Sequence, residues 1–391
     1  MRIEQLILED FRNYERAKVS FAEGINVVIG QNAQGKTNLL EAVHFLAGLG
    51  SPRAADAALV KGGAERAILH AETERRGRRL RLDLEIRPGR GTRVLVNRTP
   101  APGVKSLTEA VSAVFFGPEE LSLIKGGPDG RRRFLDDLVV KVRPARHDLR
   151  RDWDRVLRQR NALLRSMPRE PRAAAGARDS LAVWDEGVVR VGSLLTAARL
   201  EVLGGLLPHA RERYREIAGG GDLELGYSSS WLDDSISRKA LAEGGVTDVS
   251  DVRAALAAAL TEAREREIER GVSLVGPQRD DMAVLVISAA SPDGRLLDAR
   301  TFASQGDQRT CALALRLGER DLLAEVNGEQ PILLLDDVFS ELDPKRREWL
   351  GDAVRNMGQT IISSAEPGAV ASAGAARVLR VEAGRITEGD S

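Results

Sequence analysis

The sequence has 391 residues, more than one typical domain, and its 42% apolar content is enough for two cores. Its 58 basic and 58 acidic residues give zero net charge, which excludes a globally basic nucleic-acid-binding protein, so any such surface must be local. A single cysteine, Cys311, excludes an internal disulfide and a zinc site, and without a recognisable signal peptide or uninterrupted apolar span we expect a cytoplasmic protein that does not enter a membrane.

Near its start the sequence predicts a strand, a glycine-containing loop and a helix in direct succession. The β-branched run 25–29 is typical of a strand, and the loop after it fits the pattern G-x-x-x-x-G-K-[ST]. Glycines let such a loop wrap closely around a phosphate, and the helix N-terminus adds positive potential. We therefore predict that Lys36 reaches the β- and γ-phosphates of a nucleotide and that Thr37 binds Mg²⁺. The predicted phosphate loop consists of Gly30, Gln31, Asn32, Ala33, Gln34, Gly35, Lys36 and Thr37.

The following segments predict an antiparallel sheet and then a mainly helical region. Apolar residues alternate strictly with charged ones over 80–87, a Pro-Gly turn follows, and 92–96 is the expected partner strand. From about residue 129 to 271 helical patterns predominate. There we also expect a lone strand at 223–227 and breaks in the longest helix, at Gly204-Gly205 and at Pro208.

Two acidic residues end a buried strand late in the chain. The apolar run 332–335 is typical of a parallel strand covered on both faces, and Asp336 and Asp337 follow it. Acids in this position lie where open α/β sheets bind their ligands. We predict that Asp336 holds Mg²⁺ and that Asp337 orients or deprotonates the attacking water, which makes Lys36 and Asp337 the catalytic candidates.

A polar segment before this strand opens another helix. Ser304, Gln305, Gly306 and Asp307 form a helix start that could bind an anion. The alternative is an ordinary serine N-cap, with Asp307 interacting favourably with the helix dipole.

Together with Ser340-Glu341-Leu342-Asp343, these motifs occur in an order that resembles the ABC-type ATPase heads of SMC-like and RecF-like proteins. The resemblance implies an α/β fold: an ABC-type P-loop ATPase head with a mixed sheet and an antiparallel subdomain, plus an inserted, mainly helical domain. We assign the head to 1–128 and 272–391 and the helical domain to 129–271. The resemblance also implies a head-to-head homodimer with two ATP molecules between the chains, in which Ser304–Asp307 of one chain contacts the γ-phosphate held by the other.

Further motifs narrow the resemblance to the RecF family. They are Phe11-Arg12-Asn13-Tyr14, Pro118-Glu119 with Gly126-Gly127-Pro128, Arg131 to Asp136, Arg158 to Leu164, and Gly276 to Asp281. The family implies ATP and Mg²⁺ as cofactors, with Arg12 as an additional nucleotide-binding residue. It implies ATP-dependent binding of single- and double-stranded DNA at gaps, in replication, recombinational repair and the SOS response, together with RecO- and RecR-type partners.

Four positions depart from the expected motifs. Gln278 replaces an expected His, Asp307 replaces Glu or Gln, the presumed base Asp337 is one carbon shorter than Glu, and Ser364 stands where transporters place a His. A shorter base and a missing His predict slow ATP hydrolysis that acts as a timer or clamp rather than a motor. The resemblance to the RecF family further implies that DNA stimulates this hydrolysis.

Arginine clusters in the helical region are the candidate DNA contacts, because guanidinium groups bind phosphates without reading sequence. The candidates are Arg131, Arg132, Arg133, Arg150, Arg151, Arg155, Arg158, Arg160 and Arg165. Since 50 of the 58 basic residues are Arg and Asp152 and Asp154 lie among these candidates, a solvated charged face is the alternative.

Two other functions remain open from the sequence. A nucleotide-gated scaffold would share the fold but would not need hydrolysis. The ATPase subunit of a membrane transporter is disfavoured, because 300 positions separate Lys36 from Asp336 and they include a helical domain.

Overall fold

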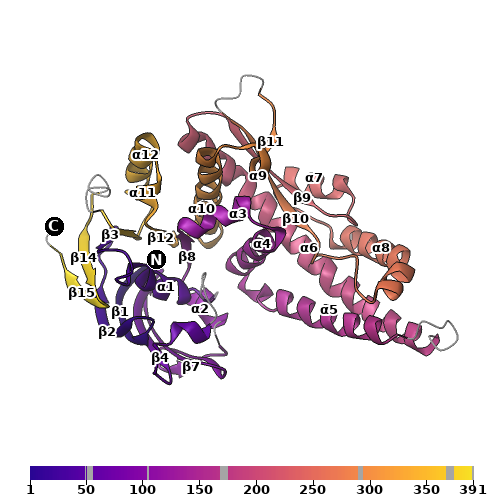
Figure 1. Cartoon of the computed structure of the whole chain (residues 1–391), viewed down its shortest axis with the longest axis horizontal. Coiled ribbons are helices and arrows are strands. Elements are labelled where there is room, and N and C mark those ends of the chain that lie inside the picture. Colours follow the sequence, from indigo (N-terminus) through magenta and orange to yellow (C-terminus); the bar gives the residue numbers. More distant parts are fainter. Residues whose placement is uncertain are drawn as a thin grey trace. The chain divides into compact units, whose positions relative to one another are not determined.

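The computed structural model describes residues 1–48, 50, 56–103, 105–167, 175–288, 294–366 and 374–389 (Figure 1). The chain divides into two compact units. Unit 1 comprises Met1–Glu120, Glu216–Gly219 and Leu313–Ser391, and unit 2 comprises Leu121–Arg215 and Gly220–Ala312. Unit 1 thus takes both ends of the sequence, whereas unit 2 takes its middle.

The phosphate loop belongs to a six-stranded sheet of unit 1. The strand order is β15-β14-β3-β13-β12-β8, and every strand is parallel to its neighbours except the edge strand β15. Every residue of β12 and β13 is buried, as the apolar runs require. The strands are β3 (Ile25–Ile29), β8 (Ala113–Phe116), β12 (Ile332–Asp336), β13 (Thr360–Ser364), β14 (Arg377–Glu382) and β15 (Arg385–Glu388).

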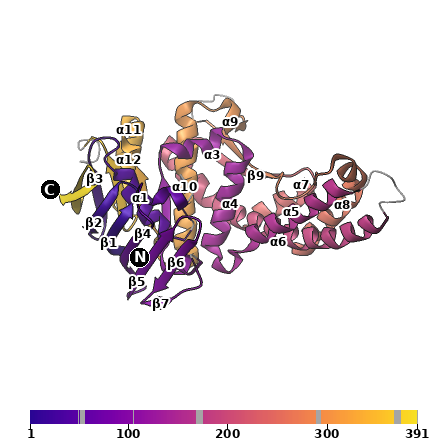
Figure 2. The same cartoon turned by 60° about the horizontal axis from the view of Figure 1, so that its bottom comes forward.

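A second sheet of unit 1 is entirely antiparallel, with the order β2-β1-β4-β5-β6-β7 (Figure 2). In β5 the side chains of Leu82, Leu84 and Ile86 are buried and the intervening residues are more exposed, which confirms the predicted alternation. The strands are β1 (Arg2–Phe11), β2 (Tyr14–Ser20), β4 (Ala67–Arg75), β5 (Arg78–Arg87), β6 (Gly91–Val96) and β7 (Thr99–Pro100).

One hydrophobic core joins both sheets to helix α1 (Lys36–Phe45). Leu39 and Val43 of α1 are fully buried, and they belong to the same apolar cluster as Leu8 of β1 and Leu334 of β12. Apolar packing on both sides therefore fixes the helix that starts at the phosphate loop. Other helices of unit 1 are α2 (Lys105–Ala110), α11 (Val338–Glu341), α12 (Pro344–Val354) and the C-terminal part of α10 (Gln305–Asn327).

Unit 2 is mainly helical, and α5 and α6 run alongside one another (Figures 1 and 2). The predicted breaks at Gly204-Gly205 and Pro208 are wrong, because α6 is one helix of 44 residues with Pro208 inside it. Gly204 instead permits a close approach, since a Cβ there would lie 2.2 Å from the backbone nitrogen of Gly245. The helices are α3 (Leu121–Lys125), α4 (Pro128–Val142), α5 (Leu149–Ser166), α6 (Ala175–Ala218), α7 (Asp234–Ala242), α8 (Val249–Arg270) and α9 (Ala299–Phe302).

Helix α6 contains the one stretch of described residues, Asp179–Ala218, that is long and apolar enough to cross a membrane. In its most apolar window 72% is buried inside the protein, as expected of a core helix.

A small antiparallel sheet completes unit 2, with the order β11-β10-β9. The strands are β9 (Asp222–Ser228), β10 (Asp281–Ile287) and β11 (Leu297–Asp298). The predicted strand 223–227 is therefore not alone, because β10, distant in sequence, pairs with it. Unit 2 extends to Ala312, whereas the predicted helical domain ends at residue 271. The compact units therefore do not share the limits predicted for the domains. The division into a head (1–128 and 272–391) and a helical domain (129–271) stays a prediction.

Candidate nucleotide site

The phosphate loop connects the end of β3 to the start of α1. Ala33 and Gly35 have φ angles of 63° and 120°, which turn the loop backbone back on itself. The Lys36 ammonium, only 6% exposed, donates to the carbonyl oxygens of Gly30 (2.7 Å) and Gln31 (2.9 Å). Lys36 therefore lies across the mouth of the loop, held by backbone carbonyls that a bound phosphate could replace.

Two neighbouring residues of the N-terminal hairpin hold the loop from one side. The buried Tyr14 hydroxyl donates to the carbonyl of Gly35 (2.9 Å), and the Asn13 amide donates to the carbonyl of Gln34 (2.8 Å). Asn13 also accepts a hydrogen bond from Asn38 of α1 (2.8 Å). The sequence did not predict this role for Asn13 and Tyr14, because no pattern in it indicates that β1 and β2 lie beside the phosphate loop.

The C-terminal hairpin β14–β15 holds the loop from another side. The backbone N–H of Ala383 donates to the Gln34 side chain (2.6 Å), and that of Gly384 donates to the Gln34 carbonyl (3.1 Å). Gly30 lies so close to β14 that a Cβ there would be 2.3 Å from the carbonyl oxygen of Val381. The loop is thus held in shape by side chains from the N-terminal hairpin and by backbone groups from the C-terminal hairpin.

The double acid lies beside the start of α1. The Thr37 hydroxyl donates to Oδ1 of Asp336 (3.0 Å), and the Ser363 hydroxyl donates to the same oxygen (2.6 Å). Thr37 and Asp336 are thus in direct contact although 299 positions separate them.

Asp337 follows with a left-handed backbone, φ 52°, which is strained for a non-glycine residue. Its N–H donates to the carbonyl (3.2 Å) and to the hydroxyl (3.0 Å) of Ser363. Its Oδ1 atom is buried and has no hydrogen-bond partner within the described residues. A strained residue with an unsatisfied buried carboxylate oxygen is typical of a functional position.

Charge in the site is concentrated on three side chains. Burial lowers the pKa of the Lys36 ammonium, while the carboxylates of Asp337 and Asp336 oppose that shift. The site therefore brings one cation, two carboxylates and the hydroxyl of Thr37 together where β12 ends and α1 begins.

These residues fit ATP with Mg²⁺. A threonine hydroxyl and an aspartate are hard oxygen ligands, and Mg²⁺ usually takes one or two protein oxygens together with substrate phosphates. The described residues contain no group of three or more His, Cys, Asp or Glu side chains that could hold a metal ion.

Arg12, the other predicted nucleotide ligand of unit 1, contacts Glu41 of α1. Two guanidinium nitrogens donate to the two carboxylate oxygens of Glu41 (both 2.7 Å), and a third donates to the carbonyl of Ala58 (2.9 Å). Glu41 is fully buried, so this pair fastens the N-terminal hairpin to α1. A direct contact of Arg12 with nucleotide stays a prediction.

The predicted helix start Ser304–Asp307 belongs to unit 2. The Ser304 hydroxyl accepts from the N–H of Asp307 (3.1 Å) and donates to its carboxylate (3.0 Å), which is an N-cap of α10. Ser288, at the end of β10, also donates to that carboxylate (3.2 Å). The cap is therefore formed in one chain alone, and the role of Ser304, Gln305, Gly306 and Asp307 toward a second chain's nucleotide stays a prediction.

Two of the arginines proposed to contact DNA are buried, and for them the prediction is wrong. Arg131 is 4% exposed and binds both oxygens of Asp281 (2.7 and 2.8 Å). Arg160 is fully buried and donates to Asp185 (2.8 Å), Ser273 (2.7 Å) and Glu267 (2.6 Å). The exposed candidates are Arg133, Arg150, Arg151, Arg155, Arg158 and Arg165, and Arg132 is half-buried.

Comparison with known proteins gives a consistent result. The family model described as "RecF/RecN/SMC N terminal domain" matches residues 2–387. The DNA replication and repair protein RecF of Streptomyces avermitilis is 42% identical over 369 residues, which cover 93% of this chain and 94% of that protein. The protein of the same name from Kineococcus radiotolerans is 41% identical over 374 residues, covering 94% and 93%.

Solved structures agree with the sequence relatives. A structure of the recombination mediator protein RecF-ATPrS in the RecFOR pathway has a TM-score of 0.86 at 26% identity, covering 100% of this chain and 98% of that chain. The corresponding RecF-ATP structure has a TM-score of 0.83 at 26% identity, with 99% of both chains covered. An Smc head domain from Pyrococcus furiosus, 13% identical with a TM-score of 0.55 and covering 99% and 96%, shares the fold. Matched over nearly its whole length in sequence and in structure, the chain belongs to the RecF family, within the RecF/RecN/SMC group of ABC-type ATPase heads.

Proposed function

We propose that this protein is an ATP-gated DNA-binding protein of DNA replication and recombinational repair. The observation that carries the proposal is the 3.0 Å contact between Thr37 and Asp336, which joins the phosphate loop to the double acid. Relatives over 40% identical are named for DNA replication and repair, and the similar solved structures are RecF with ATP or an analogue in the RecFOR pathway.

The residues of the site have distinct roles in this proposal. Backbone N–H groups of Gly30–Thr37 surround the phosphates, and Lys36 exchanges its carbonyl partners for phosphate oxygens. Thr37 and Asp336 would hold Mg²⁺, which would neutralise charge on the phosphates. Asp337, whose Oδ1 atom is unsatisfied, accepts a hydrogen bond from the attacking water and orients it.

The gate is an ATP-dependent homodimer. In it the capped helix start Ser304–Asp307 of one chain completes the nucleotide site of the other, and Arg12 is a further nucleotide ligand. The N-cap supports this role, because a preformed helix N-terminus presents N–H groups to an anion. ATP binding closes the dimer on DNA and slow, DNA-stimulated hydrolysis opens it. We further propose that RecO- and RecR-type proteins are partners and that the protein works in the cytoplasm at single-strand gaps.

DNA contact by phosphate recognition is assigned to the exposed arginines of α5. Side chains of Arg151 and Arg155 are 63% and 58% exposed, and among the described residues they pair with Asp148, which precedes α5, and with Asp152 of α5. Such exposed pairs contribute little to stability, so a DNA phosphate can replace the acid. Affinity should therefore fall linearly with the logarithm of salt concentration.

Analytical ultracentrifugation tests the gate. Wild-type protein should sediment as a dimer with ATP and as a monomer with ADP or without nucleotide, and DNA should favour the dimer. Lys36→Ala should remain monomeric in all conditions. Ser304→Ala, which removes the cap hydroxyl from α10, should bind ATP but fail to dimerise, whereas Thr261→Ala, which removes an exposed hydroxyl from α8, serves as the control. An unchanged mass of the wild-type protein in all six combinations of nucleotide and DNA would overturn the proposal.

A further inference from the structure

Ser363 lies on the strand between the double acid and the strand that leads into the phosphate loop. In β13, Ser363 is paired with Asp336 of β12 on one side and with Val28 of β3 on the other. Its side chain is fully buried. The motifs that predicted the nucleotide site do not include this residue, yet it lies between the two parts of that site.

The hydroxyl of Ser363 contacts both acids. It donates to Oδ1 of Asp336 (2.6 Å) and accepts from the N–H of Asp337 (3.0 Å). The Ser363 carbonyl accepts from the same N–H (3.2 Å). A hydroxyl has one hydrogen and two acceptor sites, so a single side chain can serve both acids at once. Ser363 thus fixes the carboxylate of the first acid and the backbone of the second.

The contact of Ser363 with Asp336 differs from the one that Thr37 makes. Both hydroxyls donate to Oδ1 of Asp336, at 3.0 Å from Thr37 and at 2.6 Å from Ser363. Thr37 is itself an expected ligand of Mg²⁺, so its hydroxyl oxygen would also contact the cation. Ser363 is not a predicted metal ligand, and its hydrogen bond can therefore orient Asp336 independently of Thr37.

The contact with Asp337 accounts for an unusual backbone conformation. Asp337 has a φ angle of 52°, and a residue other than glycine keeps this conformation only where surrounding contacts hold it. Among the described residues, the hydrogen bonds of its N–H both end on Ser363. Within the same part of the chain its buried Oδ1 atom has no hydrogen-bond partner, so the direction of the carboxylate depends on the backbone conformation.

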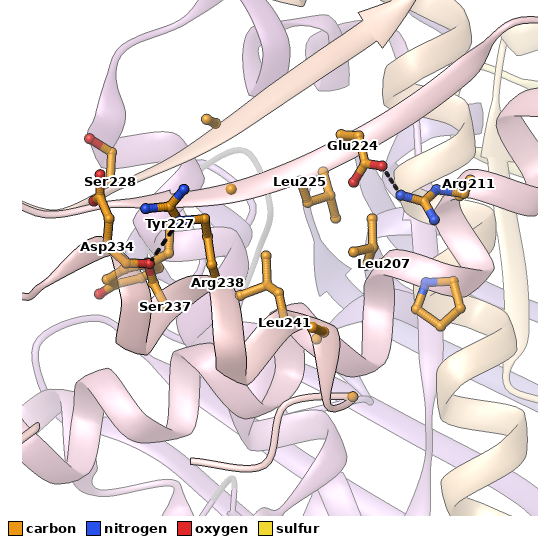
Figure 3. Close-up of a pocket in the computed structure, with 16 residues that line it drawn as sticks. Leu207, Arg211, Glu224, Leu225, Tyr227, Ser228, Asp234, Ser237, Arg238 and Leu241 are labelled. Carbon is orange, nitrogen blue, oxygen red and sulfur yellow. Dashed lines mark hydrogen bonds and ion pairs between the residues drawn. The ribbon is translucent and has the colours of Figure 1, made fainter. Parts of the chain in front are cut away.

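Charged side chains that line a groove in unit 2 provide a contrast. The groove, of about 770 Å³, lies between β9, α6 and α7, and Figure 3 shows the ion pair of Arg211 with Glu224 at one end. Arg238, which also lines the groove, donates to the carbonyl oxygen of Asp234 (3.3 Å). These arginines have their partners within unit 2. The contacts of Ser363 instead end on the two acids assigned to Mg²⁺ and to the attacking water.

We propose that Ser363 is a positioning residue of the nucleotide site, whose hydroxyl orients Asp336 toward Mg²⁺ and holds Asp337 in the backbone conformation that presents its carboxylate to the attacking water. The inference rests on the proposed function, from which it takes the roles of the two acids. Ser363 acts through these acids and not on the nucleotide itself. Loss of a group that orients a metal ligand typically weakens metal binding or activity by about 10–100-fold.

Titration with a fluorescent, non-hydrolysable ATP analogue, in excess Mg²⁺ and in EDTA, tests the orientation of Asp336. Wild-type protein should bind the analogue more tightly in Mg²⁺. Ser363→Ala removes the hydroxyl and keeps the carbonyl. It should weaken binding in Mg²⁺ by about tenfold or more and leave binding in EDTA unchanged, because Lys36 and the phosphate loop are intact. Thr360→Val is the matched control, since the buried Thr360 hydroxyl on the same strand has no hydrogen-bond partner among the described residues.

Turnover tests the hold on Asp337. In Ser363→Ala, kcat should fall by about 10–100-fold at saturating ATP and Mg²⁺, where weaker binding no longer limits the rate. Ser363→Thr, which keeps a hydroxyl on a residue that suits a strand, should bind and hydrolyse ATP much as the wild type does. If Ser363→Ala fails to fold, Ser363→Cys, whose thiol is only a weak donor, takes its place in both measurements.

The outcomes separate this inference from the proposed function. Binding and turnover equal to wild type in Ser363→Ala would overturn the inference and leave the proposed function intact. An equal loss of binding in Mg²⁺ and in EDTA would also overturn it, since that result would indicate a disturbed fold and not a misplaced Asp336. Wild-type protein that binds the analogue no more tightly in Mg²⁺ than in EDTA would contradict the roles of Thr37 and Asp336, and with them both proposals.

Discussion

The nucleotide site of unit 1 and the arginine clusters of unit 2 use the same kinds of side chain in opposite ways. In unit 2, Arg160 donates to Asp185, Ser273 and Glu267, and all four residues are buried or nearly so. In unit 1, Lys36 is held by two backbone carbonyls, and Oδ1 of Asp337 has no partner. Removing one member of a buried set of paired charges is costly to the fold, whereas groups left incomplete are available to a ligand.

The largest expected effect concerns Asp337, whose Oδ1 atom has no hydrogen-bond partner among the described residues. Asp337→Asn should lower ATP turnover by about 10²–10⁴-fold, because it removes the general base. Folding and ATP-dependent dimerisation should persist, since asparagine tolerates a left-handed backbone and the lost carboxylate oxygen has no partner. Phosphate release and sedimentation measure the two properties, with Asp352→Asn, exposed on α12, as the control. Unchanged turnover and release from DNA would favour the nucleotide-gated scaffold that needs no hydrolysis.

Arg160→Ala tests the buried ion pairs of unit 2, in which Arg160 is paired with Asp185 and Glu267. It leaves Asp185 and Glu267 without their buried cation, and breaking such a pair costs about 3–5 kcal/mol. Urea unfolding should show this loss, whereas Arg158→Ala, exposed on the same helix, should change the free energy of unfolding by less than about 0.5 kcal/mol. A small effect of Arg160→Ala would show that this buried network contributes little to the stability of the fold.

A buried carboxylate in unit 2 should make stability depend on pH. Burial raises the pKa of Asp280 to about 6, despite hydrogen bonds from Tyr227 (2.7 Å) and Trp231 (2.9 Å). Between the ordinary pKa of 3.8 and 6 the folded chain holds a proton that the unfolded chain has lost, so stability falls as pH rises. This contribution reaches about 3 kcal/mol above pH 6.

Asp280→Asn cannot titrate at this position and should lack that part of the pH dependence. Urea unfolding of both proteins between pH 4 and pH 7 measures the difference between them. If the free energy of unfolding depends on pH in the same way for both proteins, Asp280 is ionised between pH 4 and pH 7. Asp280 then belongs with the buried charges of unit 2 that have partners.

The smallest expected effect concerns the support of the phosphate loop. Tyr14→Phe removes the hydroxyl that donates to the Gly35 carbonyl, a loss of about 1 kcal/mol. If the contact holds the loop in its binding shape, ATP affinity should weaken by up to about fivefold at this energy, as titration with a fluorescent nucleotide would show. Unaltered affinity together with lower stability would make Tyr14 a purely structural residue.

Local patterns predicted much of this molecule. The strand, loop and helix around Gly30–Thr37 lie within about twenty residues. The apolar run before Asp336 is typical of a buried strand. Each of these segments is therefore predicted by its own local sequence. The alternation in β5 was equally clear.

Contacts between distant segments could not be predicted. Whether an arginine is buried depends on its partners, and Asp185 and Glu267 lie 25 and 107 positions from Arg160. The supports of the phosphate loop come from residues 13–14 and 383–384, and none of these carries a signal of that role in its own segment. Pro208 predicts a helix break by its chemistry, yet the tertiary packing of α6 retains the helix around it.

The position of β3 in its sheet has a consequence for how the protein is made. Its two neighbours, β13 and β14, are translated more than 300 residues after it, whereas the elements of unit 2 lie between them in the chain. On the ribosome β3 must therefore wait with both edges unpaired, while unit 2 already has the residues it needs to fold. The nucleotide site should be the last part of the protein to form during synthesis, so a chain that stalls or misfolds late would retain a folded unit 2 without the ability to bind ATP.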